Sequence, residues 1–118
     1  MATTRRCCRD NNRLTEGVDA VAIITTLTGR GFTIDMYKRL RQGVNWDGEP
    51  VDGWLAHAVR WDESDVIHMT NMWVSVEHMQ KGFATRLGPV MRKIGIPPPH
   101  GEVHETFNLT VFQATDPA

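Results

Sequence analysis

Cysteine is scarce in this 118-residue sequence, and the shortage narrows what the protein can be. The only two cysteines, Cys7 and Cys8, are neighbours, so they cannot link distant elements as a disulfide framework does. Adjacent cysteines also lack the spacing of a zinc site. Such cysteine usage fits a reducing compartment, and we expect a cytoplasmic protein with one domain.

The sequence also lacks a strong net charge and a long apolar run. Its net charge is −1 at pH 7, so we expect no nucleic-acid partner. The longest apolar run, Val18–Leu27, is interrupted by Asp19 and two threonines, so we expect no membrane span. Basic residues gather in residues 1–17, which we interpret as a disordered tail, with contact to an anionic partner as the alternative. Residues 18–113 form the predicted domain, and 114–118 a second tail.

The hydrophobic pattern predicts four strands and two helices. The predicted strands cover residues 19–27, 54–61, 66–73 and 102–112. The first predicted helix has Thr33 as its N-cap and stops at Gly43. The second begins after the cap Ser75 and is kinked or restarted at Gly88-Pro89. The order β-α-β-β-α-β predicts an α+β fold of the ferredoxin-like type, with an antiparallel sheet in the order 4-1-3-2 and both helices on one face.

Large apolar side chains occur on both faces of the predicted sheet. Trp54 and Trp73 share one parity, whereas Leu55, Trp61 and Met72 share the other. A monomer would expose one of these sets to water. A second sheet packed against it would cover this set, so we predict a homodimer.

Three stretches carry a resemblance to a known family. "WVSVEHM", then "FATRLGPVMRKIGIPPP", and earlier "GRGFTIDMYKRL" resemble the dimeric α/β-barrel superfamily, in its antibiotic-biosynthesis-monooxygenase-like branch. The resemblance covers about residues 19–112. It implies a dimeric α/β barrel, oxygenation without a cofactor, and an aromatic or polyketide-type substrate in an apolar pocket. The haem-degrading branch requires a tryptophan, a histidine and an asparagine where this sequence has Gly82, Arg92 and Ile23 or Ile24, so we reject haem degradation.

Two histidines of the predicted hairpin are candidate catalytic residues. A hairpin symmetric about Glu63 and Ser64 places Val59 opposite His68. His57 and His68 then form a diagonal pair on one face, with Cα atoms roughly 7–8 Å apart. Histidine titrates near neutrality, which suits a general base. The alternative is two half-buried histidines, each hydrogen-bonded to a neighbour.

The same pocket has candidate substrate-binding residues on several elements. They are Tyr37, Asn71, Trp73, Phe83 and Asn108. A buried amide needs hydrogen-bond partners, so Asn71 either orients a ligand or ties down a loop. Tyr37 is the sole tyrosine, and its alternative role is a core aromatic with its hydroxyl at the rim.

The remaining histidines point to no metal site. His100 and His104 are four residues apart, but on a strand their imidazoles point in unrelated directions, so we expect no metal. His78 lies in the first turn of the second helix and is interpreted as a neutral surface residue. The leading hypothesis is therefore a small cofactor-independent monooxygenase-like enzyme, with His57 as base and His68 as helper. The alternatives are a non-catalytic ligand-binding or interaction homodimer, and a cyclase or isomerase.

Overall fold

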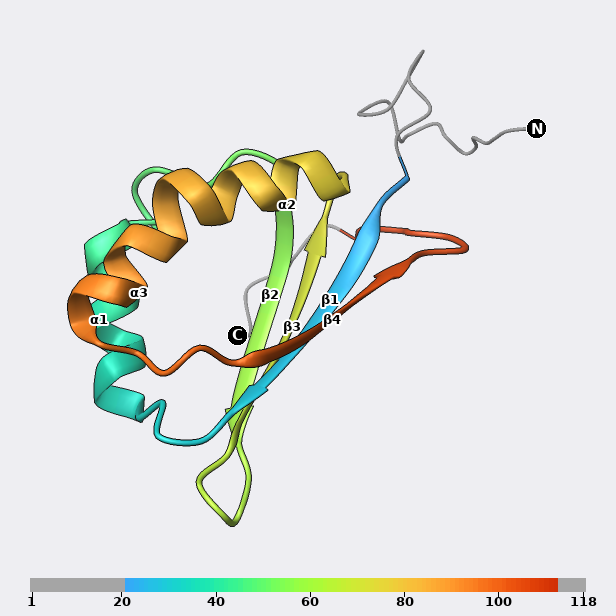
Figure 1. Cartoon of the computed structure of the whole chain (residues 1–118). Coiled ribbons are helices and arrows are strands. Elements are labelled where there is room, and N and C mark those ends of the chain that lie inside the picture. Colours follow the sequence, from blue (N-terminus) through green and yellow to red (C-terminus); the bar gives the residue numbers. More distant parts are fainter. Residues whose placement is uncertain (1–20, 113–118) are drawn as a thin grey trace, which may run out of the picture.

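A single antiparallel sheet, covered on one face by helices, makes up the fold. The computed structural model describes residues 21–112 (Figure 1). The sheet order is β2-β3-β1-β4, with strands β1 (Ile23–Gly29), β2 (Trp54–Trp61), β3 (Ile67–Trp73) and β4 (His100–Glu105). This order is the predicted one, and the α+β ferredoxin-like fold is confirmed. The predicted tails, 1–17 and 114–118, lie outside the described residues.

The helices pack along one face of the sheet, as predicted (Figure 1). They are α1 (Ile34–Val44), α2 (Val76–Gly82), a π-helical turn η3 (Phe83–Leu87) and α3 (Gly88–Ile94). Within residues 21–112 no helix is long and apolar enough to cross a membrane.

The predicted helix starts are confirmed, whereas one predicted stop is wrong. The hydroxyl of Thr33 accepts a hydrogen bond from Met36 N at 3.1 Å, and Ser75 caps α2 in the same way. The first helix does not stop at Gly43. It continues to Val44 and ends at Asn45, which adopts the left-handed conformation with φ 59°. Asparagine tolerates this conformation, so it can replace glycine as the terminating residue.

The second helix contains the irregularity expected at Gly88-Pro89. Proline has no N–H to continue the α-helical ladder. The backbone N–H of Gly88 instead reaches Phe83 O, five residues back, which is the pattern of a π-helix. The three segments α2, η3 and α3 therefore follow one another without a loop.

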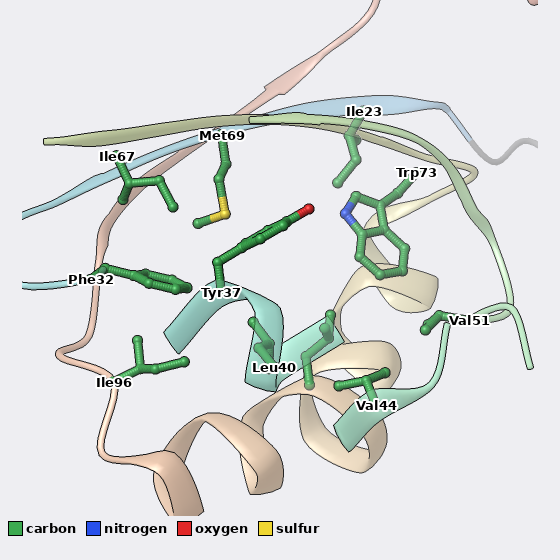
Figure 2. Packing of buried hydrophobic residues seen from close by; sticks show 11 residues of the cluster. Ile23, Phe32, Tyr37, Leu40, Val44, Val51, Ile67, Met69, Trp73 and Ile96 are labelled. Carbon is green, nitrogen blue, oxygen red and sulfur yellow. The ribbon is translucent and has the colours of Figure 1, made fainter. Parts of the chain in front are cut away.

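The core lies between the inner sheet face and the helices (Figure 2). Its largest fully buried side chains are Ile23, Phe32, Ile67 and Trp73. Tyr37 reaches from α1 towards β3 among these residues, so a polar hydroxyl enters an otherwise apolar region (Figure 2). Apolar packing alone does not require this hydroxyl group in the core.

The limits of β1 and β4 differ from the prediction. β4 ends at Glu105 instead of Phe112, because Glu105 pairs with Ile23, the first residue of β1. Thr106 N still donates to Ala22 O at 3.0 Å, and the chain then leaves the sheet. Within the described residues β1 begins at Ile23, later than the predicted start at residue 19.

Trp61 lies on the inner face, contrary to the prediction. It belongs to the set packed against the core, and its indole N–H donates to Phe32 O at 2.8 Å. The outer sheet face is therefore less apolar than the alternation of the sequence indicated, and the homodimer stays a prediction.

Candidate functional site

A small pocket lies between the inner sheet face and the helices. Its aromatic and polar lining residues include Tyr37, Trp46, Trp54, His57, Asn71 and Phe83, and leucine and methionine side chains complete it. The cavity is about 20 Å³, which is room for about one water molecule. The site therefore has no room for a substrate ring in this structure.

The turn of the β2–β3 hairpin decides which residues face this pocket. Asp62 accepts hydrogen bonds from the backbone N–H groups of Ser64 and Val66, at 2.8 and 3.1 Å. Asp65 adopts a left-handed conformation with φ 61°. This turn is centred on Ser64 rather than between Glu63 and Ser64. The register from Ala56 to Trp61 consequently moves by one residue from the predicted one, whereas Trp54 lies opposite Trp73 as predicted.

The shifted register separates His57 from His68. His57 is opposite Asn71, and His68 is opposite Arg60. Side chains alternate along a strand, so His68 points to the outer face while His57 points into the pocket. The predicted histidine pair is therefore wrong. His68 Nε2 instead lies 2.8 Å from Asp62 Oδ2, and this contact with two backbone N–H groups lowers the pKa of Asp62 to about 2.

A β-bulge at Leu55 brings one more side chain to the inner face. Trp54 is opposite Trp73 and Ala56 is opposite Met72, so two residues of β2 match one interval of β3. The bulge places Trp54 and His57 on the same face despite their odd spacing. The two rings lie with centroids 5.0 Å apart.

Tyr37, His57 and Asn71 form a hydrogen-bonded chain at this pocket. The Tyr37 hydroxyl lies 2.7 Å from His57 Nε2, and His57 Nδ1 lies 2.6 Å from Asn71 Oδ1. Asn71 is only 3% exposed. The three residues come from α1, β2 and β3, so the fold itself assembles the chain.

The indole N–H of Trp54 fixes the direction of every hydrogen bond in the chain. It donates to Asn71 Oδ1 at 3.1 Å, and an indole can only donate. The amide oxygen must therefore face both Trp54 and His57. Because that oxygen only accepts, His57 carries its proton on Nδ1 and presents a lone pair on Nε2. Tyr37 then donates its hydroxyl proton to His57.

Burial keeps the chain uncharged at neutral pH. Burial lowers the pKa of His57 below 6.5, against the opposing effect of the hydrogen bond to Asn71, and Arg41 lowers it further. Burial also raises the pKa of Tyr37 above 10.0, and Asp47 adds to this increase, whereas Arg41 opposes it. A neutral imidazole, whose Nε2 can take up a proton, is the protonation state that a general base needs.

The other predicted ligand contacts are only partly brought together. Phe83 lines the pocket, and Trp73 is fully buried with its ring stacked on Trp54 at 5.4 Å. Asn108 is exposed beyond β4, where its amide donates to Thr110 Oγ1 at 3.1 Å. The prediction that Asn108 lies in the pocket depends on a last strand that extends to Phe112. It is wrong, because β4 ends at Glu105.

Two further histidine positions can be compared with the prediction. His78 is half-buried rather than a free surface residue, since the Ser75 hydroxyl lies 2.6 Å from its Nδ1. His104 Nε2 lies 3.1 Å from Glu102 Oε1 on the exposed strand β4. Among residues 21–112 no group of three or more His, Cys, Asp or Glu side chains could hold a metal ion.

Two residues that line the pocket, Trp46 and Trp54, are not among the predicted site residues. Trp46 lies in the polar segment between α1 and β2, yet it lines the pocket. A large aromatic residue within a turn-rich polar stretch was the available signal. Exposure of such a side chain to water is unfavourable, so it tends to pack against the core.

Comparisons with solved structures support the fold. A protein of unknown function from Nitrosomonas europaea shares 11% sequence identity, with a TM-score of 0.58 over 80% of this chain and 96% of that one. A candidate antibiotic biosynthesis monooxygenase from Chloroflexus aurantiacus shares 19%, with a TM-score of 0.51 over 80% and 98%. A second such candidate, from Deinococcus radiodurans, shares 16%, with a TM-score of 0.50 over 80% and 99%.

No protein-family model and no curated protein matches the sequence. The resemblance noted in the sequence is therefore confirmed by three-dimensional structure, at the level of the fold. The chain has the ferredoxin-like α+β fold that the antibiotic-biosynthesis-monooxygenase-like structures share.

Proposed function

We propose that the protein is a small cofactor-independent monooxygenase-like enzyme, which acts on an aromatic or polyketide-type molecule bearing an ionisable hydroxyl. The observation that carries this proposal is the chain from Tyr37 through His57 to Asn71, buried at the edge of an apolar pocket. Packing of the core does not by itself require that Asn71 fix the tautomer of His57. Such an arrangement is typical of proton transfer.

In this mechanism the proton leaves the substrate through Tyr37. The His57 Nε2 lone pair is occupied by the Tyr37 hydroxyl, so the substrate's hydroxyl donates to the tyrosine oxygen. As Tyr37 accepts that proton, it passes its own proton to His57. The tyrosine stays neutral throughout, which avoids a tyrosinate whose pKa burial has raised. Asn71 Oδ1 accepts a hydrogen bond from the resulting imidazolium at Nδ1.

The substrate anion then reacts with molecular oxygen. For a ring CH₂ group, one oxygen atom becomes the new carbonyl oxygen and the other leaves as water with both hydrogens. In this reaction the protein binds the ring, removes the proton and excludes bulk water. Fold likeness to two monooxygenase candidates agrees with this chemistry.

A cyclase or isomerase would use the same base without oxygen, and a non-catalytic binding protein would use the pocket alone. Oxygen consumption with a panel of phenols, hydroquinones and anthrones tests these three functions. We expect turnover by the wild type and a loss of about 10²-fold or more in His57→Gln. His68→Gln is the matched control, because His68 lies on the outer sheet face. Equal rates for wild type and His57→Gln would remove the base from the mechanism.

We also propose a homodimer. Large apolar side chains are exposed near β4 and the segment after it, including Val103 at 50%, Phe107 at 105% and Phe112 at 84%. An exposed group of this kind is typical of a protein–protein contact. Light scattering should give twice the chain mass, and a monomer mass at micromolar concentration would contradict the proposal.

A further inference from the structure

Trp46 is held less firmly than the other three tryptophans of the protein. Trp54 and Trp61 each donate an indole hydrogen bond, at 3.1 and 2.8 Å, and Trp73 is 0% exposed. Trp46 is half-buried, and no described residue accepts a hydrogen bond from its Nε1. Trp73 Nε1 also has no hydrogen-bond partner, but its ring is fully buried. Trp46 is therefore the partly exposed tryptophan whose ring can leave its place without breaking a hydrogen bond of its own.

The ring of Trp46 lies against the functional groups of the site. Its centroid is 5.9 Å from Tyr37, 5.0 Å from Trp54 and 5.5 Å from His57, at interplanar angles of 60°, 82° and 66°. These are edge-to-face contacts of the kind that aromatic ligands make. A ring in this place would have its substituents next to the Tyr37 hydroxyl.

The remaining free space is too small for any ring. A cavity of about 20 Å³ admits about one water molecule, whereas binding pockets for small molecules measure hundreds of Å³. The other walls are the sheet and packed helices. Entry of a substrate therefore requires one aromatic side chain to leave.

We propose that Trp46 occupies the substrate's ring position in the closed site, and that the substrate is a hydroxylated, planar, fused aromatic which displaces it. The inference rests on the proposed function, because it takes Tyr37 and His57 as the groups that receive the substrate's hydroxyl. Trp46 is then a specificity-determining residue. The ligand must be at least as large as an indole to regain the three ring contacts that Trp46 gives up.

The segment that carries Trp46 is bounded by two backbone turns and fastened by a few contacts. Two positive φ angles bound it, 59° at Asn45 and 80° at Gly53. Arg86, from η3, fastens it by donating to Val44 O at 3.0 Å and to Glu49 O at 2.6 Å. Arg86 is thus a positioning residue for this segment, together with the Arg41–Asp47 ion pair at 2.6 Å and the buried side chain of Val51.

Binding of 2-naphthol, measured by calorimetry without turnover, tests the inference. Trp46→Ala should bind 2-naphthol at least about tenfold more tightly than the wild type, since the ligand no longer competes with the protein's own indole. Added indole should raise the Tm of this variant by refilling the vacated place. Trp61→Ala is the matched control, because Trp61 also contacts Tyr37, at 5.7 Å, but does not line the pocket. It should show neither effect.

Arg86→Gln tests the same inference with the ring intact. It should tighten 2-naphthol binding and increase quenching of tryptophan fluorescence by acrylamide. If Trp46→Ala and Arg86→Gln bind no more tightly than wild type, Trp46 does not compete with the ligand and the inference is overturned. Tight binding without turnover of any phenol would instead reject the proposed reaction and leave the role of Trp46 standing.

Discussion

Replacing Tyr37 by phenylalanine removes a single oxygen atom from the centre of the site. The hydroxyl donates to His57 Nε2 at 2.7 Å, and such a hydrogen bond contributes about 0.5–1.5 kcal/mol net. A buried acceptor left without a donor would add a further 1–3 kcal/mol, roughly. The adjacent cavity of about 20 Å³ has room for one water, which could donate to Nε2 instead. We therefore expect a loss of about 1 kcal/mol, which lowers Tm by roughly 4–8 °C.

The variant should also change the titration of His57. The tyrosine hydroxyl donates to the neutral imidazole and can turn to accept from the imidazolium, and the bond to the charged ring is the stronger of the two, so its removal should lower the pKa of His57. NMR titration of the imidazole C–H signals measures this pKa, with His68→Gln to identify the second hairpin histidine. Turnover should fall by about 10²-fold or more if the proton passes through Tyr37. An unchanged pKa of His57 together with an unchanged Tm would refute the hydrogen-bond chain.

Three further changes test the surroundings of the chain. Asn71→Leu leaves the indole and imidazole N–H donors without an acceptor, and urea unfolding should show a loss of about 2–4 kcal/mol. Because burial lowers the pKa of His57 below 6.5, the unfolded chain binds a proton first on acidification. Wild-type stability should therefore fall as pH drops below about 6.5, and this part of the decline should be missing in His57→Gln. Gly82→Ala places a Cβ 2.9 Å from Trp73 Cη2 and should cost about 1–3 kcal/mol in thermal unfolding, whereas Gly48→Ala meets only the flexible end of a side chain.

Local signals in the sequence predicted the fold well. A hydroxyl residue before an amphipathic stretch marked Thr33 and Ser75 as caps, and both are caps. The alternation of apolar residues located the hairpin strands, with β2 found at its true limits, Trp54–Trp61. These features depend on neighbours within four residues, so a single sequence contains them.

The wrong predictions concern strand limits and register, which depend on contacts between different strands and with the hairpin turn. The end of β4 depends on the length of β1, because a strand has no partner beyond Ile23. The register of the hairpin depends on three side-chain and backbone contacts of Asp62, and a change of one residue there reverses the face of His68. Of the predicted site, Tyr37, His57 and Asn71 do meet, although the register that was assumed placed His57 opposite a different residue.

The bulge at Leu55 has a consequence for how this site can be traced in relatives. Trp54 and His57 face the same pocket only because one extra residue separates them. A relative with β2 one residue shorter would keep the same two side chains on one face at a spacing of two. Matching positions one by one would then pair Trp54 with the wrong residue. The placement of these two side chains depends on geometry and chain length together, so comparison of such proteins must allow a gap inside this strand.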